Sequence, residues 1–275
     1  MKKILHFSDI HFGGAHAPGR ADSLLVAIDR VRPDVVALSG DLTQRARTHQ
    51  FREARAWLDR ISAPLIVVPG NHDVPLWDVA DRFLSPLEKY KRWITADLNP
   101  MYRDDELAVI GIDTTRSFTI KGGEVEGNDL RAVRDKLSGL PSNLCKVVVA
   151  HHPFASPPGP KREQAVGGAR RALRLFEKLG VEIVLTGHLH QTYITSSRDL
   201  YPTSKHGILL VQAGTVASLR GRGSEHMKNS FNLITVAERE ITVTSYIYSD
   251  EHAEFAPHAT HTWERPARHQ NTQQP

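Results

Sequence analysis

The residues best suited to chemistry stand in short polar clusters that follow apolar runs. One of them is Gly70-Asn71-His72-Asp73, which comes after the apolar residues 65–68. It places an amide, an imidazole and a carboxylate side by side at the end of an expected buried strand. Since buried polar groups need hydrogen-bonding or metal partners, this cluster is more typical of a metal or phosphate site than of a core.

Four further clusters of the same kind supply partners for it. They contain Asp9 and His11, Asp41, His151 and His152, and His188 and His190. Carboxylate oxygens and imidazole nitrogens suit manganese, iron, zinc or cobalt, whereas magnesium and calcium prefer shells of oxygen. Cys145 is the only cysteine in the sequence, so a structural zinc finger built on thiolates is excluded.

Two metal ions held together could act on a phosphate ester. Ions roughly 3.5–4 Å apart can clamp a phosphate, lower the pKa of a water between them and aim it in line with the leaving group. Such a pair needs one ligand that binds both ions. Asp41 is the natural candidate, because it follows a central strand.

The elements expected to position these clusters alternate between strand and helix. Apolar runs predict strands at residues 4–7, 35–38, 65–68, 107–112, 146–150 and 183–185. Apolar residues at helical spacing predict helices at residues 24–31, 51–61, 128–137 and 170–179. This alternation predicts parallel βαβ units, in which the ligand crevice lies at the carboxyl ends of the strands. The polar clusters occupy that position.

Residues 74–100 break the alternation. Five apolar residues at 79, 83, 87, 90 and 94 form a stripe, and basic residues surround it. We expect an amphipathic helical insertion near the site that packs on the domain. A substrate cap, a subunit contact and a membrane-surface helix stay open as alternatives.

The end of the chain has a different pattern. Residues 193–195, 208–213, 231–236 and 241–248 read as strands without helices between them, which predicts a second, more antiparallel sheet. From about residue 256 the sequence is rich in His, Pro, Thr and Gln and lacks periodicity. We therefore expect one domain at residues 1–255 and a polar C-terminal tail at residues 256–275 that is surface-bound or disordered.

In order along the chain, these clusters resemble the motifs of the calcineurin-like metallophosphoesterase superfamily. The motifs are Asp9-x-His11, Gly40-Asp41, Gly70-Asn71-His72-Asp73, His151 and Gly187-His188-x-His190. The resemblance covers about the first 190 residues through these motifs and extends through the later strands to about residue 250. It implies an α/β fold, a four-layer αββα sandwich of two mixed β-sheets flanked by helices, with the metal site at the carboxyl ends of the strands.

The resemblance also implies a role for each residue of the clusters. Asp9, His11 and His190 would bind the first metal ion, and Asn71, His151 and His188 the second, with Asp41 as the bridge. His72 would contact the phosphate and protonate the leaving oxygen, and we expect Asp73 to orient the His72 ring. Asn71, His72 and His152 are expected to face the substrate, although His152 also competes with His151 as a metal ligand.

The implied activity is metal-dependent hydrolysis of a small-molecule phosphoester. The motif spacing most resembles bacterial cyclic-nucleotide and glycerophosphodiester phosphodiesterases, so we expect a phosphodiesterase with two metal ions. A phosphomonoesterase and a nucleotide-lipid pyrophosphate hydrolase at the membrane surface stay open as alternatives. A non-catalytic interaction scaffold of the same fold is the alternative from another class, but such proteins are expected to lose ligands, and here all are present.

Composition adds limits to these expectations. The chain of 275 residues is 40% hydrophobic and carries a formal charge of +4, with a sequence pI of about 9.2. This mildly basic balance fits a phosphate-bearing substrate but not the concentrated basic face of a nucleic-acid-binding protein. A single cysteine fits a reducing compartment, no targeting segment is visible, and no apolar run reaches the length of about 18 residues that a membrane span needs. We expect a cytoplasmic protein, and its oligomeric state stays open.

Overall fold

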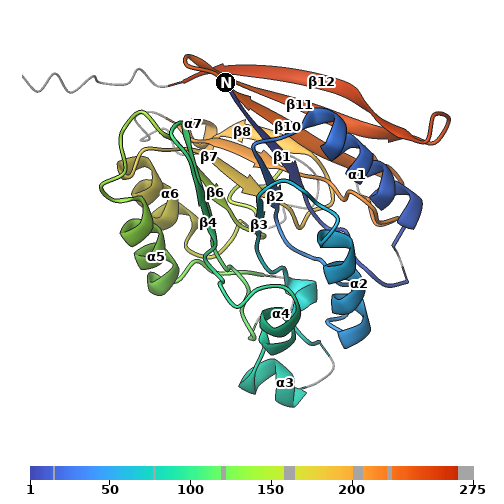
Figure 1. The fold of residues 1–275 in the computed structure, drawn as a ribbon. Helices are drawn as coiled ribbons and strands as arrows, with labels where there is room; N and C mark the ends of the chain where they lie inside the picture. The colour runs from blue at the N-terminus through green and yellow to red at the C-terminus, as the bar shows by residue number, and fades with distance from the viewer. Residues whose placement is uncertain are drawn as a thin grey trace, which may run out of the picture.

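Two β-sheets pack face to face at the centre of the computed structural model, and helices cover their outer sides (Figure 1). The structure describes residues 1–14, 16–76, 79–118, 122–157, 165–200, 207–221 and 225–265. These layers form the predicted αββα sandwich.

The first sheet joins strands from both ends of the chain. In spatial order it contains β12 (Glu254–Glu264), β11 (Glu240–Ser249), β10 (Ser230–Val236), β1 (Lys2–Phe7), β2 (Val35–Leu38) and β3 (Leu65–Val67). β1, β2 and β3 are parallel, while β10 runs antiparallel to β1. The sheet is therefore mixed, and its three parallel strands end on the same side.

The second sheet is built from the middle of the chain. Its order is β4 (Met101–Arg103), β5 (Leu107–Gly111), β6 (Cys145–Val149), β7 (Val181–Thr186), β9 (Leu209–Gln212) and β8 (Tyr193–Ser196). β5, β6, β7 and β9 are parallel, and the edge strands β4 and β8 are antiparallel to their neighbours.

Three hydrophobic clusters hold the layers together. One lies between the first sheet and the helices α1 (Pro18–Val31), α2 (Thr48–Leu58) and α4 (Glu88–Trp93). Another lies between the second sheet and the helices α5 (Gly127–Leu137) and α6 (Ala169–Lys178). The third, which contains Ile4 and Cys145, fills the space between the sheets. Since both faces of each sheet are covered, the parallel strands are mostly apolar, and the charged residues of β1 stand at its start.

The late strands do not form a sheet of their own. The predicted second, more antiparallel sheet is wrong in this respect, because β8 and β9 join the second sheet whereas β10 and β11 extend the first. Hydrophobic runs specify that a strand is buried, but they do not specify which sheet edge it pairs with.

The predicted polar tail is wrong for the strand β12. This strand pairs with β11 along nearly its whole length, and Phe255 is buried in the core. Cross-strand threonine pairs join Thr242 to Thr262 and Thr244 to Thr260. Threonine favours strands, but the exposed face of β12 has no apolar alternation and its sequence reads as a tail. The rest of the predicted tail, residues 266–275, lies outside the described residues.

The predicted insertion consists of two short helices rather than one. Leu87, just before α4, and Tyr90 within it are buried against the first sheet and α2, as expected for a helix that packs on the domain. The other helix, α3 (Val79–Leu84), leaves Phe83 and Leu84 exposed. Both helices lie at the end of the molecule opposite the start of β1 (Figure 1).

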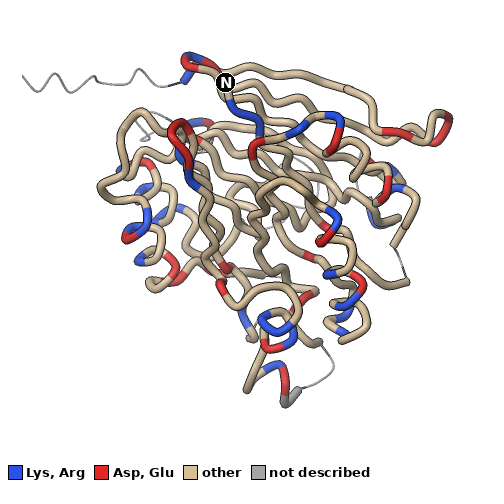
Figure 2. The backbone as a smooth tube through the Cα atoms, in the orientation of Figure 1, with Lys and Arg blue, Asp and Glu red and all other residues tan. Residues whose placement is uncertain are grey.

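The outer surface is mixed in charge. Lys and Arg are interspersed with Asp and Glu over the outer helices (Figure 2). Within the part of the chain that the structure describes, no helix is long and apolar enough to cross a membrane.

The remaining elements are two short helices. η1 (Asn71–Asp73) is a single 3₁₀ turn after β3, and α7 (Ser197–Leu200) is one turn after β8. The turn η1 belongs to the candidate site.

Candidate metal centre

All the predicted ligand residues lie in loops that leave the carboxyl ends of parallel strands. The loops follow β1, β2 and β3 in the first sheet and β6 and β7 in the second. Backbone hydrogen bonds join neighbouring loops, from Asp9 N–H to the carbonyl of Gly40 at 3.0 Å and from Gly187 N–H to the carbonyl of His151 at 3.0 Å. The packing of the two sheets therefore brings residues from distant parts of the sequence to one place.

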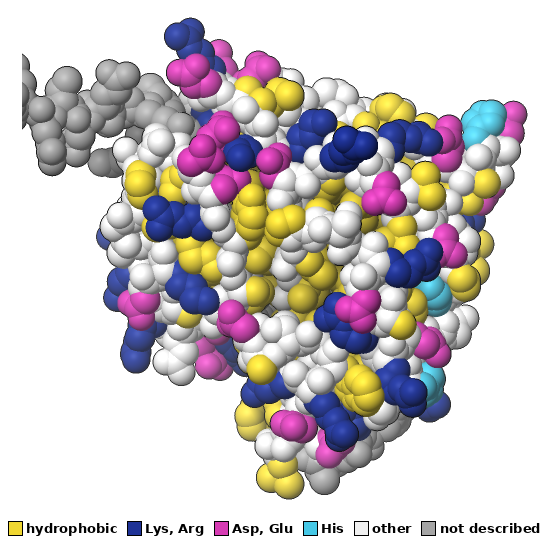
Figure 3. Space-filling view, in the orientation of Figure 1, with side chains coloured by type: hydrophobic (Ala, Val, Ile, Leu, Met, Phe, Trp, Pro, Cys, Tyr) yellow, Lys and Arg dark blue, Asp and Glu magenta, His cyan; other side chains and the backbone are white. Residues whose placement is uncertain are grey.

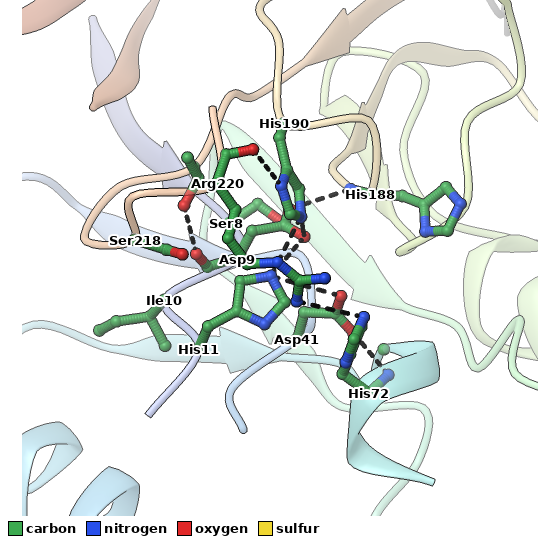
Figure 4. Close-up of polar contacts among 12 residues, drawn as sticks. Ser8, Asp9, Ile10, His11, Asp41, His72, His188, His190, Ser218 and Arg220 are labelled. Carbon is green, nitrogen blue, oxygen red and sulfur yellow. Dashed lines mark hydrogen bonds and ion pairs between the residues drawn. The ribbon is translucent and has the colours of Figure 1, made fainter. Parts of the chain in front are cut away.

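Four side chains form a first donor group, which contains Asp9, His11, Asp41 and His190. Nε2 of His190 is 3.0 Å from Oδ1 of Asp9 and 3.0 Å from Nε2 of His11. Nε2 of His11 is in turn 3.8 Å from Oδ2 of Asp41. Figure 4 shows these side chains pointing toward one another.

Three side chains, those of Asn71, His151 and His188, form a second donor group. Oδ1 of Asn71 is 3.1 Å from Nε2 of His151 and 2.9 Å from Nδ1 of His188. Nε2 of His151 and Nδ1 of His188 are 3.2 Å apart. One oxygen and two imidazole nitrogens therefore converge, which is a donor set that suits a borderline divalent metal.

Asp41 lies between the two donor groups. Its Oδ2 faces His11 of the first group, while its Oδ1 is 3.4 Å from Nε2 of His151 in the second. The carboxylate thus presents one oxygen to each group. Oδ1 also accepts a hydrogen bond from the backbone N–H of His72 at 2.8 Å.

The backbone of these loops is held in an uncommon conformation. Asp9, His11, Asp41, His188 and His190 all have positive φ angles, between 51° and 74°. This left-handed region is unfavourable for residues with a Cβ, and it is found where the surrounding structure fixes the backbone for function.

Gly70 is needed for the same close packing. A Cβ at this position would overlap Oδ1 and the backbone nitrogen of Asp41. The loop after β3 can approach the loop after β2 only because residue 70 has no side chain.

Two of the imidazoles are oriented by backbone carbonyls. Nδ1 of His151 donates to the carbonyl of Ser39 at 2.7 Å, and Nδ1 of His190 donates to the carbonyl of Arg220 at 2.9 Å. Each bond fixes the tautomer and leaves the lone pair of Nε2 directed into its donor group. Such outer contacts orient histidine ligands in metalloproteins.

The electrostatics of the centre favour a cation. Asp9 and Asp41 are 0% and 1% exposed, and neither Oδ1 of Asp9 nor Oδ2 of Asp41 accepts a hydrogen bond within the described residues.

Burial and the nearby carboxylates of Asp9 and Asp73 raise the pKa of Asp41 well above its ordinary value. Burial also lowers the pKa of His11 to about 3 and lowers that of His151, so these imidazoles are neutral at pH 7. Neutral imidazoles and buried carboxylate oxygens that accept no hydrogen bond fit metal ions.

His72 lies beside the first donor group, with 5.0 Å between the centroids of its ring and the ring of His11, but Asp73 does not orient it. Nδ1 of His72 donates to the carbonyl of Gln44 at 2.8 Å. The Asp73 carboxylate instead accepts hydrogen bonds from the backbone N–H groups of Leu42, Thr43 and Gly70. The predicted role of Asp73 is therefore wrong. Because Asp73 turns away from the ring within η1, its carboxylate joins the loop after β2 to the loop after β3.

His152 is buried behind the second donor group. It is only 1% exposed, and its Nδ1 lies 2.8 Å from Oγ1 of Thr114. Its ring centroid is 4.9 Å from those of both His151 and His188. This position does not support the predicted direct contact with substrate. It does keep His152 within reach of the ligand atoms of these two histidines.

One residue at the centre, Arg220, was not predicted from the sequence. Its guanidinium nitrogen Nη1 lies 3.5 Å from Nε2 of His72 (Figure 4). The only local signal is an arginine beside glycine in the loop after β9, and no spacing relates that loop to the histidine motifs.

The chain matches a known protein family over more than half of its length. The family model for calcineurin-like phosphoesterases matches residues 2–192, which include every predicted ligand. This chain belongs to the calcineurin-like phosphoesterase family. Its members hydrolyse phosphoester bonds with the help of metal ions, and the metal-dependent phosphoesterase class predicted from the sequence is therefore confirmed.

Two relatives of this calcineurin-like phosphoesterase are named as phosphodiesterases. The glycerophosphodiester phosphodiesterase GpdQ of Enterobacter lignolyticus is 28% identical over 201 residues, covering 72% of this chain and 68% of the relative. A cAMP/cGMP dual specificity phosphodiesterase of Mycobacterium tuberculosis is 27% identical over 217 residues, covering 68% of this chain and 61% of the relative.

A solved structure supports the fold of this calcineurin-like phosphoesterase over nearly its whole length. The purple acid phosphatase PPD1 from yellow lupin superposes with a TM-score of 0.70 at 14% identity, covering 97% of this chain and 54% of that protein. At this identity the likeness concerns the fold alone.

Proposed function

We propose that this calcineurin-like phosphoesterase is a phosphodiesterase with two metal ions. The observation that carries the proposal is the position of Asp41, whose two carboxylate oxygens face different donor groups. Asp9, His11 and His190 would hold one ion, and Asn71, His151 and His188 the other. Manganese, iron, zinc and cobalt all suit this mixture of oxygen and nitrogen donors.

The bound ions would supply the chemistry of hydrolysis by polarising the phosphoryl group and lowering the pKa of a water between them. The protein would position the reacting groups. Asp41 keeps the donor groups together, and the carbonyl of Gln44 holds the His72 ring with Nε2 directed to the edge of the centre. His72 would then contact the phosphoryl group and transfer a proton to the leaving oxygen.

The protonation state of the His72 ring decides whether it can act as the acid. Burial lowers the pKa of His72 to about 4, and the charge of Arg220 contributes to the decrease, so the free ring is neutral. An acid needs a proton on Nε2. To act as the acid, His72 would therefore need to gain a proton on Nε2 before the leaving oxygen departs.

Preference for a diester is supported by the relatives named as phosphodiesterases. The test is to prepare the chain with manganese and compare aryl diester, aryl monoester, cyclic nucleotide, glycerophosphodiester and nucleotide-lipid substrates side by side. We expect the diesters to be hydrolysed fastest and a chelator to abolish the activity. Faster turnover of monoesters would contradict the diester assignment while leaving the family unchanged.

A second candidate function is supported by an exposed apolar tip. Phe83, Leu84 and Phe118 are 49%, 83% and 89% exposed, and the rings of Phe83 and Phe118 are 5.4 Å apart. Hydrophobic side chains gather at this tip, over α3 (Figure 3). An exposed apolar patch is typical of an interaction site, and a membrane surface would bring a nucleotide-linked lipid to the centre. Nucleotide-lipid turnover that exceeds diester turnover and requires vesicles would favour this second function.

The scaffold alternative is disfavoured because the complete donor set is retained. A purified chain that binds no metal and hydrolyses none of the five substrates, yet binds a protein partner, would restore it.

A further inference from the structure

The loop that carries Arg220 is fixed to the strands around the centre. Val216 N–H donates to the carbonyl of Ser8 at 3.1 Å, and Oγ1 of Thr215 donates to the carbonyl of Asp9 at 2.6 Å. Farther along, the side chain of Asn229 donates to the carbonyl of Ser218 at 2.8 Å. Arg220 is therefore presented by an ordered segment that is tied to the first donor group.

The two ends of Arg220 contact different parts of the centre. Its backbone carbonyl accepts the hydrogen bond that orients His190. Its side chain extends past His11, and Nη1 reaches Nε2 of His72 (Figure 4). The backbone thus supports a predicted metal ligand, whereas the guanidinium lies at the edge where His72 stands.

The guanidinium is poorly satisfied in this position. Across the described ranges it forms no ion pair with a carboxylate, and its one side-chain contact, to His72, is long at 3.5 Å. An arginine offers five N–H donors in a planar fork that matches two oxygens of a phosphate. Other arginines of this chain, such as Arg116 and Arg265, form close ion pairs with Asp129 and Glu182. The donors of Arg220 are accordingly available to an anionic ligand.

We propose that Arg220 binds the non-bridging phosphoryl oxygens of the substrate. This inference rests on the proposed function, because it names the group that recognises the phosphate at that same site. The guanidinium adds a fixed positive charge on the substrate side of the centre, beside His72. It favours an anionic phosphoryl group that presents two free oxygens, as both a phosphodiester and inorganic phosphate do.

The test measures binding of inorganic phosphate to the manganese-loaded chain by titration calorimetry. Arg220→Met removes the charge and keeps a long side chain, and Arg220→Lys keeps the charge but loses the fork. Leu219→Ala is the matched control, because this neighbouring side chain is 47% exposed and contributes no polar group. None of the variants alters the backbone carbonyl that orients His190, so their manganese content should equal that of the wild type.

Loss of a charge-assisted bidentate contact is expected to weaken phosphate binding about tenfold to a hundredfold in Arg220→Met. Arg220→Lys should fall between Arg220→Met and the wild type, and Leu219→Ala should bind as the wild type does. Equal phosphate affinity in Arg220→Met, or no phosphate binding by the wild type, would overturn the proposal. Loss of manganese from Arg220→Met would overturn it too, since it would show a structural role.

The same titration separates this inference from the proposed function. If phosphate binding depends on Arg220 but the wild type hydrolyses no phosphoester, the proposed function fails and the Arg220 assignment stands. If the wild type hydrolyses diesters and Arg220→Met retains both phosphate affinity and KM, only the Arg220 assignment fails.

Discussion

At the scale of single residues, the chemistry depends on where a few side-chain atoms point. Oδ1 and Oδ2 of Asp41 face different donor groups, and its backbone is held at a φ of 54°. The histidines around it are set by carbonyls, such as that of Ser39 for His151. Substitution of Asp41 is therefore expected to affect both metal sites, whereas substitution of a histidine such as His151 is expected to affect one.

Replacement of Asp41 by alanine tests the bridge. We expect Asp41→Ala to lose at least one of two metal ions and to reduce kcat/KM by more than about a hundredfold, because loss of an outer contact alone commonly costs 10–100-fold in metal affinity or activity. Metal analysis and diester assays on the same preparation provide the measurement. Full metal occupancy together with normal turnover would show that Asp41 is not shared.

Replacement of His72 by alanine separates substrate chemistry from metal binding. The His72 ring contacts Gln44 and Arg220 and packs edge-to-face against the ring of His11, with 5.0 Å between the centroids, but His72 is not itself one of the predicted ligands. We expect His72→Ala to retain its metal and to lose about a hundredfold or more in rate, most severely with poor leaving groups, because general acid catalysis contributes 10²–10⁴-fold. A loss of rate that is the same for good and poor leaving groups would rule out proton transfer by His72.

Residue types and spacing predicted the donor set because the chemistry restricts it strongly. Buried carboxylates and imidazoles that follow several strand ends are typical of metal sites. In the structure, the side chains of Asp9, Asp41 and His190 converge as predicted. The contacts of Asp73 could not be predicted, because the direction of a side chain in a single 3₁₀ turn depends on the loop packed against it. Arg220 also escaped prediction, since a loop joined to the centre only by tertiary contacts has no sequence spacing to read.

At the scale of the elements, the site depends on loops that pack closely at strand ends. Gly70→Ala would push a Cβ into Asp41. We expect it to lower the free energy of unfolding by about 1–3 kcal/mol, as overpacking does, and to weaken metal binding. Urea unfolding and metal titration would measure both effects.

Gly127→Ala is the matched control for that substitution. Gly127 begins α5, and a Cβ there would meet no atom within 4 Å. Alanine in a helix is favourable by roughly 0.5–1 kcal/mol relative to glycine, so this variant should be as stable as the wild type or slightly more stable. Equal losses in the two variants would mean that close packing at Gly70 has no special importance.

An ion pair between the sheets gives a pH-dependent prediction. Nζ of Lys2 in β1 lies 2.9 Å from Oδ2 of Asp104, in the turn between β4 and β5. Burial alone would raise the pKa of Asp104, but hydrogen bonds from the backbone of Glu106 and from Lys2 outweigh it and hold the pKa below its usual value. A lowered pKa in the folded state adds stability above the unfolded pKa, near 3.9, and this stability is lost as the pH falls through the folded value.

Asp104→Asn should therefore be less stable than the wild type at pH 7 by about 0.5–1 kcal/mol, the range of a partly exposed pair. The difference should shrink as the pH falls below about 4. Asp105→Asn is the control, because Asp105 is 86% exposed and lies 3.6 Å from Lys2. A deficit in Asp104→Asn that stays constant from pH 7 to pH 3 would contradict the assignment.

The elements themselves were predictable where burial is complete. Residues 35–38 form β2 with the predicted bounds, because a strand covered on both faces is apolar throughout. The strand β12 was not predictable, because most of its side chains are exposed and its sequence shows no apolar pattern, although it pairs with β11 along nearly its whole length. The short edge strand β4 was also missed, because two half-buried residues and one exposed residue give too little pattern to read.

At the scale of the whole molecule, the fold creates the centre by opposing two sheets. The motifs after β1, β2 and β3 come from the first sheet, and those after β6 and β7 come from the second. Neither sheet holds a complete donor group: the first group needs His190 from the second sheet, and the second needs Asn71 from the first. The sequence predicted this sandwich only through its family resemblance, because no local pattern specifies how two sheets face each other.

The phosphodiesterase activity that we propose needs two metal ions acting together at this centre. The most direct test is to titrate metal-free protein with manganese while following hydrolysis of an aryl phosphodiester. If both ions are required, we expect no hydrolysis without metal and a rate that rises to a plateau at two equivalents of manganese per chain. A plateau at one equivalent, or hydrolysis that persists in a chelator, would contradict it.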